Sequence, residues 1–114
     1  MTLRQQQSQF AQHVALLIQY IWSQGYTCTL GEAYRTPEQA RLNAAKGIGI
    51  ANSLHTQRLA MDLNIFDKNG MLLTDSKDYT FAGEYWEPLD KANVWGGRWK
   101  KLVDGNHFER RLLK

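Results

Sequence analysis

The sequence predicts an α+β fold in which helices pack on a small antiparallel sheet. Two observations lead to this class: amphipathic helical spacing early in the chain, and short strand-like segments joined by turns later on. With 114 residues, 43% hydrophobic and 22% charged, the composition is that of a globular protein. We therefore expect a single domain over residues 1–114 that folds without disulfides.

Helical spacing occurs in three segments. The first, residues 8–24, carries an apolar stripe that would face the core. The second, residues 36–47, begins with a Thr-Pro pair, which is typical of a helix N-terminus. The third, residues 79–92, is amphipathic but is interrupted or started late by Pro88. The stripe residues of the first helix are Phe10, Val14, Leu17 and Ile21.

Strand-like segments supply the sheet. They are short, rich in β-branched or alternating apolar residues, and bounded by turn residues. A loop is expected over residues 95–99, between the third helix and the last strand. The expected strands are 26–30, 59–66, 71–73 and 107–110.

Charge and cysteine content restrict the function classes. There are 14 Lys and Arg against 11 Asp and Glu, and the net charge of +3 favours an anionic partner without choosing one. No aromatic and basic motif supports a nucleic-acid binder. No apolar run approaches the roughly 20 residues of a membrane span, and the first residues lack a signal peptide, so we expect synthesis in the cytoplasm. The sole cysteine, Cys28, excludes an internal disulfide and a cysteine-based zinc cluster.

Two of the three histidines lie close to acidic residues in the sequence. His55 precedes an expected strand that carries Asp62, and His107 opens the last strand three residues after Asp104. Two imidazoles and one carboxylate are the ligand set of a catalytic zinc, with the fourth position left to water. Spacing alone leaves a second interpretation open, namely turn-capping carboxylates and hydrogen-bonded core histidines.

Other notable side chains have weaker signals. We expect His13 at the surface or rim of the first helix, and Cys28 to act as a small apolar residue in a strand. Trp99 is expected in the core, whereas Trp95 is a candidate wall of a substrate cleft. Glu109 is expected to be solvated, with a role in holding a histidine as the alternative.

Four stretches of the sequence occur in a distinctive order. They are Glu32-Ala-Tyr-Arg35-Thr, Ser53-Leu-His55-x6-Asp62-Leu, Trp95-Gly-Gly-x-Trp99 and Asp104-Gly-Asn-His107-Phe-Glu. Together they resemble the VanY-like zinc peptidases, a family that includes D-alanyl-D-alanine carboxypeptidases and relatives of the hedgehog signalling domain. The resemblance spans residues 26–109 and is greatest to phage endolysins that are L-alanyl-D-glutamate peptidases.

The resemblance implies a hedgehog-like or D-Ala-D-Ala-peptidase-like fold, Zn²⁺ as the cofactor, and a role for each matching side chain. The implied metal ligands are His55, Asp62 and His107. Asp104 would be the general base. Arg35 would pair with a substrate carboxylate or steady the oxyanion, and Ser53 would hydrogen-bond the substrate near the metal.

The function implied is a zinc-dependent peptidoglycan peptidase, an endolysin that cleaves the L-alanyl-D-glutamate bond of the stem peptide. By the same resemblance it would act as a monomer on the periplasmic wall after release from the host cytoplasm. Two alternatives stay open: a D-alanyl-D-alanine carboxypeptidase, and a zinc-bearing binding module without catalysis. Asp104 argues against both, because the carboxypeptidases usually have Glu there and a binding module needs no base. The chain departs from many members at Arg58, where they have Gly beside the metal.

Overall fold

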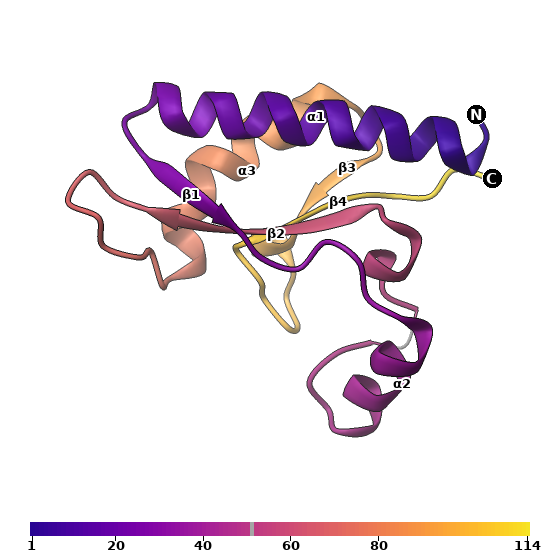
Figure 1. The fold of residues 1–114 in the computed structure, drawn as a ribbon. Coiled ribbons are helices and arrows are strands. Elements are labelled where there is room, and N and C mark those ends of the chain that lie inside the picture. Colours follow the sequence, from indigo (N-terminus) through magenta and orange to yellow (C-terminus); the bar gives the residue numbers. More distant parts are fainter. Residues whose placement is uncertain (51) are drawn as a thin grey trace.

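The computed structural model describes residues 1–50 and 52–114, and these ranges form the expected α+β fold (Figure 1). The sheet is antiparallel and four-stranded, in the order β1-β2-β4-β3. Its strands are β1 (Thr27–Leu30), β2 (Ala60–Phe66), β3 (Asn93–Trp95) and β4 (His107–Arg110). The helices are α1 (Leu3–Ser23), α2 (Pro37–Ala45) and α3 (Thr80–Trp86), and the short 3-10 helices are η1 (Leu54–Gln57), η2 (Ser76–Tyr79), η3 (Glu87–Leu89) and η4 (Gly96–Arg98).

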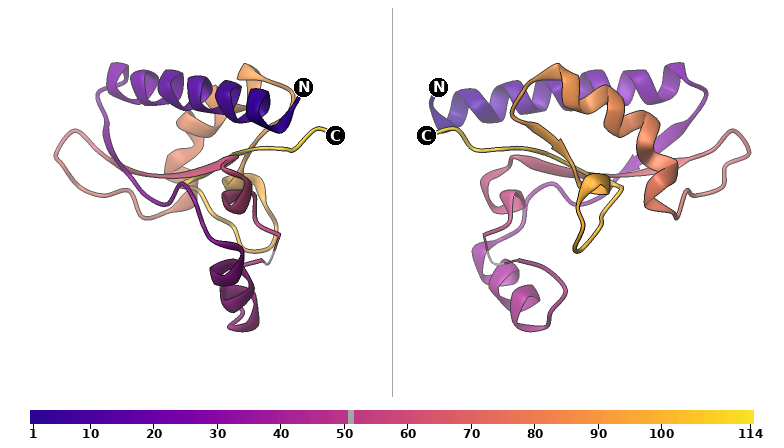
Figure 2. Two further views of the ribbon diagram at one scale, coloured as in Figure 1. Left: turned by 45° about the vertical axis from the view of Figure 1, so that its right-hand side comes forward. Right: turned by 180° about the vertical axis from the view of Figure 1, so that it is seen from behind.

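The two faces of the sheet have different partners. Helices α1 and α3 cover one face, whereas α2 and the loop that follows β3 lie on the other (Figure 2). Side chains alternate along β2, so Leu63 and Ile65 are buried under the helices while Asp62 and Asn64 lie on the opposite face. The apolar core therefore lies on the helix side of the sheet, and the polar side chains of β2 lie on the side of α2.

Helix α1 confirms the expected stripe but begins earlier than the sequence-based start. Phe10, Val14, Leu17 and Ile21 are all buried. Thr2 and Gln5 form a reciprocal capping box, a start signal that the apolar periodicity alone does not include. None of the helices in the described ranges has the length and apolarity needed to cross a membrane.

The expectation of a surface position for His13 is wrong. Its side chain is 7% exposed, because α1 packs against α3 and the buried face of the helix is wider than the stripe. The imidazole lies 6.3 Å from the Trp86 ring and contacts the Asn93 amide. His13 is therefore part of the core.

The segment expected as one helix over residues 79–92 divides into η2, α3 and η3, and a strand follows it. Pro88 lies in η3, where its missing N–H and its ring end the α-helix. Residues 93–95, part of which was expected as loop, pair with β4 as strand β3. The returning strand expected at residues 71–73 is reduced to a single bridge between Phe66 and Leu72.

Candidate metal centre

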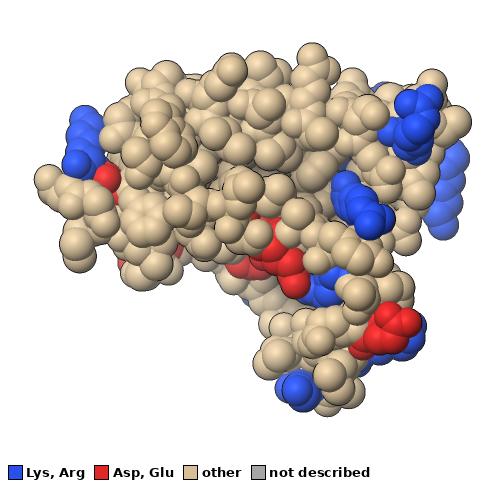
Figure 3. All heavy atoms as spheres, viewed as in Figure 1, with Lys and Arg blue, Asp and Glu red and all other residues tan. Residues whose placement is uncertain are grey.

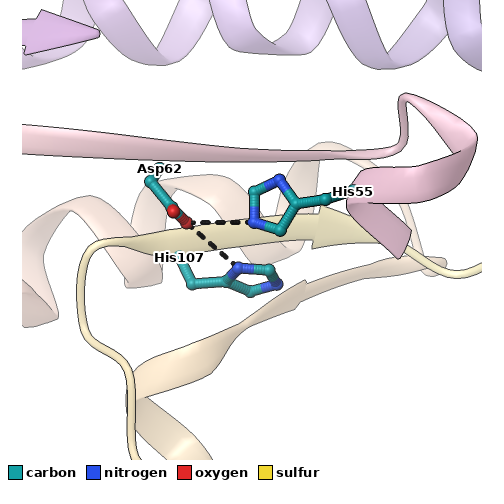
Figure 4. A group of neighbouring side chains, drawn as sticks. All are labelled: His55, Asp62 and His107. Carbon is teal, nitrogen blue, oxygen red and sulfur yellow. Dashed lines mark hydrogen bonds and ion pairs between the residues drawn. The ribbon is translucent and has the colours of Figure 1, made fainter. Parts of the chain in front are cut away.

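Three side chains from separate elements meet on the open face of the sheet (Figure 4). Asp62 on β2 and His107 on β4 are cross-strand partners, and His55 projects from η1. Asp62 Oδ1 lies 3.3 Å from His55 Nε2 and 3.2 Å from His107 Nδ1. The three side chains offer one potential ligand atom each, all within 4.8 Å of one another. The structure thus brings together the three residues predicted as metal ligands.

The turn that carries His55 is fixed at both ends. Ser53 caps η1, because its Oγ accepts a hydrogen bond from the His55 amide at 3.2 Å. Arg58 ends η1 in the left-handed region, with φ of 56°, the conformation that Gly adopts most easily. Its guanidinium lies 4.1 Å above the centre of the Tyr34 ring, a cation–π contact that holds the turn against the preceding segment. Arg58, which stands where many members of the family have Gly, therefore keeps the left-handed turn.

Hydrogen bonds behind the two imidazoles orient them toward Asp62. His55 Nδ1 lies 3.1 Å from the Ala33 carbonyl, which can only accept, so Nδ1 carries the hydrogen and Nε2 presents a lone pair. His55 Nε2 is buried, and because its 3.3 Å approach to Asp62 Oδ1 is not a hydrogen bond, it has no hydrogen-bond partner among the described residues. His107 Nε2 lies 2.8 Å from Glu109 Oε1, which leaves Nδ1 facing Asp62. An imidazole backed by a carbonyl or carboxylate is typical of a metal ligand, and the orphaned Nε2 fits a cation at this place.

The electrostatics of the cluster favour a positive charge between its members. Burial would raise the pKa of Asp62, but the hydrogen bond from His107 and the adjacent imidazole of His55 outweigh it and lower the pKa to about 2. Burial would lower the pKa of His107, but its hydrogen bonds to Asp62 and Glu109 outweigh it and raise the pKa to about 9. Asp62 is therefore ionised at neutral pH, and a metal ion would take the place of the His107 proton.

Asp104 lies at the edge of this cluster. Its Oδ2 is 4.0 Å from His107 Nδ1, so it is near the candidate metal position but outside the group of three ligand atoms. Burial and the negative charge of Asp62 raise the pKa of Asp104. The backbone fixes its position, since the Asp104 amide donates to the Gly96 carbonyl at 3.1 Å and its carbonyl accepts from the His107 amide. A carboxylate held at this place with a raised pKa is suited to accept and return a proton.

A cleft of about 890 Å³ opens beside the cluster, and both Arg35 and Ser53 line it. In Figure 3, acidic and basic side chains meet in the hollow between the sheet and the part of the chain that contains α2. Arg35 is 15% exposed and donates through Nε to Glu32 at 2.8 Å, while its amide donates to the His55 carbonyl. Ser53 is buried but reaches the cleft, so both residues lie where a substrate could contact them.

The two tryptophans exchange the positions expected from the sequence. Trp95 is 4% exposed and does not line the cleft, so its assignment as a cleft wall is wrong. Trp95 pairs with Phe108 across β3 and β4 and therefore points to the helix face, where its indole N–H donates to the Gly105 carbonyl at 2.7 Å. The η4 turn then carries Trp99 to the other side, where it lines the cleft with its ring centre 4.9 Å from that of His107.

Glu109 has a different position from the solvated one expected. Its side chain is 6% exposed, accepts a hydrogen bond from His107 and forms an ion pair with Arg111, whose Nε lies 3.0 Å from Oε2. The sequence contains a signal for this position, because a residue two places after His107 on a strand lies on the same face. The expectation of a solvated Glu109 is therefore wrong. The alternative expectation, that Glu109 holds a histidine, matches its hydrogen bond to His107.

A family model described as D-alanyl-D-alanine carboxypeptidase matches residues 46–110, more than half of the chain, and this range includes the three candidate metal ligands and Asp104. No curated protein matches the chain significantly.

Solved structures with the same fold include three peptidases. The L-Ala D-Glu endopeptidase ChiX of Serratia marcescens aligns with a TM-score of 0.72 and 20% identity, over 89% of this chain and 77% of that one. The vancomycin resistance D,D-pentapeptidase VanY, solved as a mutant with Zn(II), aligns with a TM-score of 0.60 and 16% identity, over 89% and 70%. The LD-carboxypeptidase LdcB aligns with a TM-score of 0.59 and 16% identity, over 91% and 64%.

Proposed function

Because this chain belongs to the D-alanyl-D-alanine carboxypeptidase family and is a metallopeptidase, we propose that it hydrolyses the L-alanyl-D-glutamate bond of peptidoglycan stems. The observation that carries the proposal is the buried His55 Nε2, orphaned beside Asp62 and His107, with Asp104 at the edge of the same cluster. The fold it shares with the L-Ala D-Glu endopeptidase ChiX supports this choice of bond.

His55, Asp62 and His107 would hold the metal, which we propose is Zn²⁺. Zinc bound there would supply a Lewis acid that polarises the carbonyl of the scissile amide. Asp104 would accept a proton from the attacking water and return it to the leaving amine, a sequence that its raised pKa favours. Glu109 would hold the His107 ring in place through its 2.8 Å hydrogen bond.

Arg35 would bind a carboxylate of the substrate on one side of the scissile bond. Glu32 occupies its Nε edge, which orients the guanidinium in the cleft while Nη1 keeps its hydrogens for a ligand. Ser53 would contribute its hydroxyl hydrogen, because its oxygen already accepts the His55 amide. We further propose that the protein acts as a monomeric endolysin that reaches the periplasmic wall from the host cytoplasm.

The proposal is tested with purified protein, its metal content and isolated peptidoglycan sacculi. We expect about one zinc per chain, and mass spectrometry of the digest should show new L-alanine carboxyl ends paired with D-glutamate amino ends. Release of D-alanine alone would identify the carboxypeptidase activity instead. Binding of sacculi with no new ends would identify a binding module.

The variant Asp104→Asn separates catalysis from binding. It keeps the shape of the side chain but cannot accept a proton, so turnover should fall by about 10²–10⁴-fold with zinc retained. Asp78→Asn, at an exposed carboxylate of η2, is the matched control. Full turnover in Asp104→Asn would exclude Asp104 as the base, and loss of zinc would make it a ligand.

A further inference from the structure

We propose that the loop after β3 divides the substrate cleft into two chambers of different charge, and that this difference fixes the direction in which a stem peptide lies. The inference rests on the proposed function. The cleft beside Arg35 is one chamber. A second cavity of about 390 Å³, lined by Asn64 and Thr74 among others, is the other chamber.

Asp104 lies at the boundary between the chambers. It lines both cavities, and it is carried by residues 96–106, the loop that descends from the sheet in Figure 1. The second chamber continues along β2 from the candidate metal centre, since Asn64 lies on the same face as Asp62. A peptide whose scissile bond lies at Asp104 would therefore extend into one chamber on each side.

The first chamber carries three cations. Arg35 is paired with Glu32, and Arg111 is paired with Glu109. Lys101 also lines this chamber, and in the described ranges no carboxylate forms an ion pair with it. Lys101 therefore offers its charge to a ligand, in addition to the Nη1 edge of Arg35.

The second chamber is neutral apart from Asp104 itself. Its polar lining consists of amides and hydroxyls, and the Asn106 amide donates to the Asn64 side chain at 3.2 Å. Ser76 Oγ accepts a hydrogen bond from the Gly105 amide at 2.9 Å, and this bond holds the loop against η2. Amides and hydroxyls recognise uncharged groups that both donate and accept hydrogen bonds.

The stem peptide has the same asymmetry about the proposed bond. On the amine side, D-glutamate carries a free carboxylate next to the scissile nitrogen, and a charged part of the stem follows. On the acyl side, L-alanine is joined through a lactyl group to an N-acetylated sugar, which is uncharged and rich in amide and hydroxyl groups. Charge complementarity thus places the D-glutamate side in the chamber of Lys101 and the muramyl side in the chamber of Asn64.

Two pairs of synthetic substrates test this direction. The first pair is the stem peptide with and without its muramyl sugar, and the second is the stem peptide with the D-glutamate α-carboxylate or with its carboxamide. The enzyme variants are Lys101→Met and Asn64→Ala, with Lys100→Met and Asn69→Ala as controls at exposed positions outside both chambers. Thr74→Val, which keeps the shape of its side chain, is a second variant of the neutral chamber. Zinc content confirms that each variant is folded.

The readout is the ratio of kcat/KM within each pair. Lys101→Met should lower the carboxylate-over-carboxamide ratio by at least about fivefold without changing the sugar ratio. Asn64→Ala and Thr74→Val should lower only the sugar ratio. If Lys101→Met lowered the sugar ratio, and Asn64→Ala and Thr74→Val lowered the carboxylate-over-carboxamide ratio, the proposed direction would be overturned. Unchanged ratios in all variants would overturn the division into two chambers. Wild-type enzyme that hydrolyses none of the four substrates would refute the proposed function itself.

Discussion

Substitution of Glu109 by Gln tests whether the residue behind His107 tunes the metal centre. The change keeps the shape of the side chain and its ability to accept the His107 Nε2–H hydrogen bond of 2.8 Å, but it removes the negative charge. The ion pair with Arg111 is also lost, although it contributes little because the Arg111 side chain is 59% exposed. The perturbation therefore acts mainly on one buried, charge-assisted hydrogen bond.

The expected size of the effect follows from the strength of that bond. A hydrogen bond to a charged group contributes about 1.5–3 kcal/mol, and a neutral one about 0.5–1.5 kcal/mol. The difference of about 1–1.5 kcal/mol corresponds to roughly a tenfold loss of zinc affinity. Glu109→Ala also leaves the buried Nε2–H without a partner, so its affinity should fall toward the upper end of the 10–100-fold range, about 100-fold.

The assay is competition for zinc against a chromophoric chelator, with the same titration on Glu38→Gln as the control. Glu38 is an exposed carboxylate on α2, with only a 3.9 Å ion pair to Arg41, and its substitution should leave zinc affinity unchanged. Equal zinc affinity in wild type and Glu109→Gln would refute the argument that Glu109 tunes His107. An equal loss in Glu38→Gln would show a general charge effect in place of a local one.

Substitutions at three further positions test other parts of the structure. Arg35→Lys keeps the charge but loses the planar fork, so hydrolysis of sacculi should fall roughly tenfold or more with zinc content unchanged; wild-type rates would exclude a substrate contact. Arg58→Ala should lower the free energy of unfolding by about 0.5–1 kcal/mol, because it removes the contact with Tyr34. Arg58→Gly should stay near wild type, because it also relieves the left-handed φ of 56°. Urea denaturation of both variants distinguishes the two results. Gly83→Ala would place a methyl group against the buried Trp95 ring, so thermal unfolding should show a loss of about 1–3 kcal/mol, and an unchanged melting temperature would contradict the close packing of α3 on β3.

The sequence predicted most of the regular elements because their signals are local. The apolar stripe of α1, the Thr36 cap of α2 and the alternation in β2 each depend on a few adjacent residues. Strand β3 was missed because its three residues become a strand only by pairing with β4. The helix expected over residues 79–92 failed for a related reason, since Pro88 ends it and the chain then joins the sheet.

The candidate site divides in the same way between local and long-range information. His55, Asp62, His107 and Asp104 were found from residue type, spacing and resemblance, and the structure brings them together. The positions of Trp95 and Trp99 could not be predicted, because the β3–β4 register decides which indole faces the core.

The register of β2 against β4 also sets the order in which this protein can mature. Asp62 and His107 face each other across the sheet but are 45 positions apart in the chain. A nascent or partly unfolded copy in which β4 has not docked offers only His55 and Asp62, too few ligands to retain a metal ion firmly. Acquisition of the metal would then be a late event that follows completion of the sheet. Hydrolytic activity would appear only in finished molecules, and a chelator would loosen the strand pairing that the ion had secured.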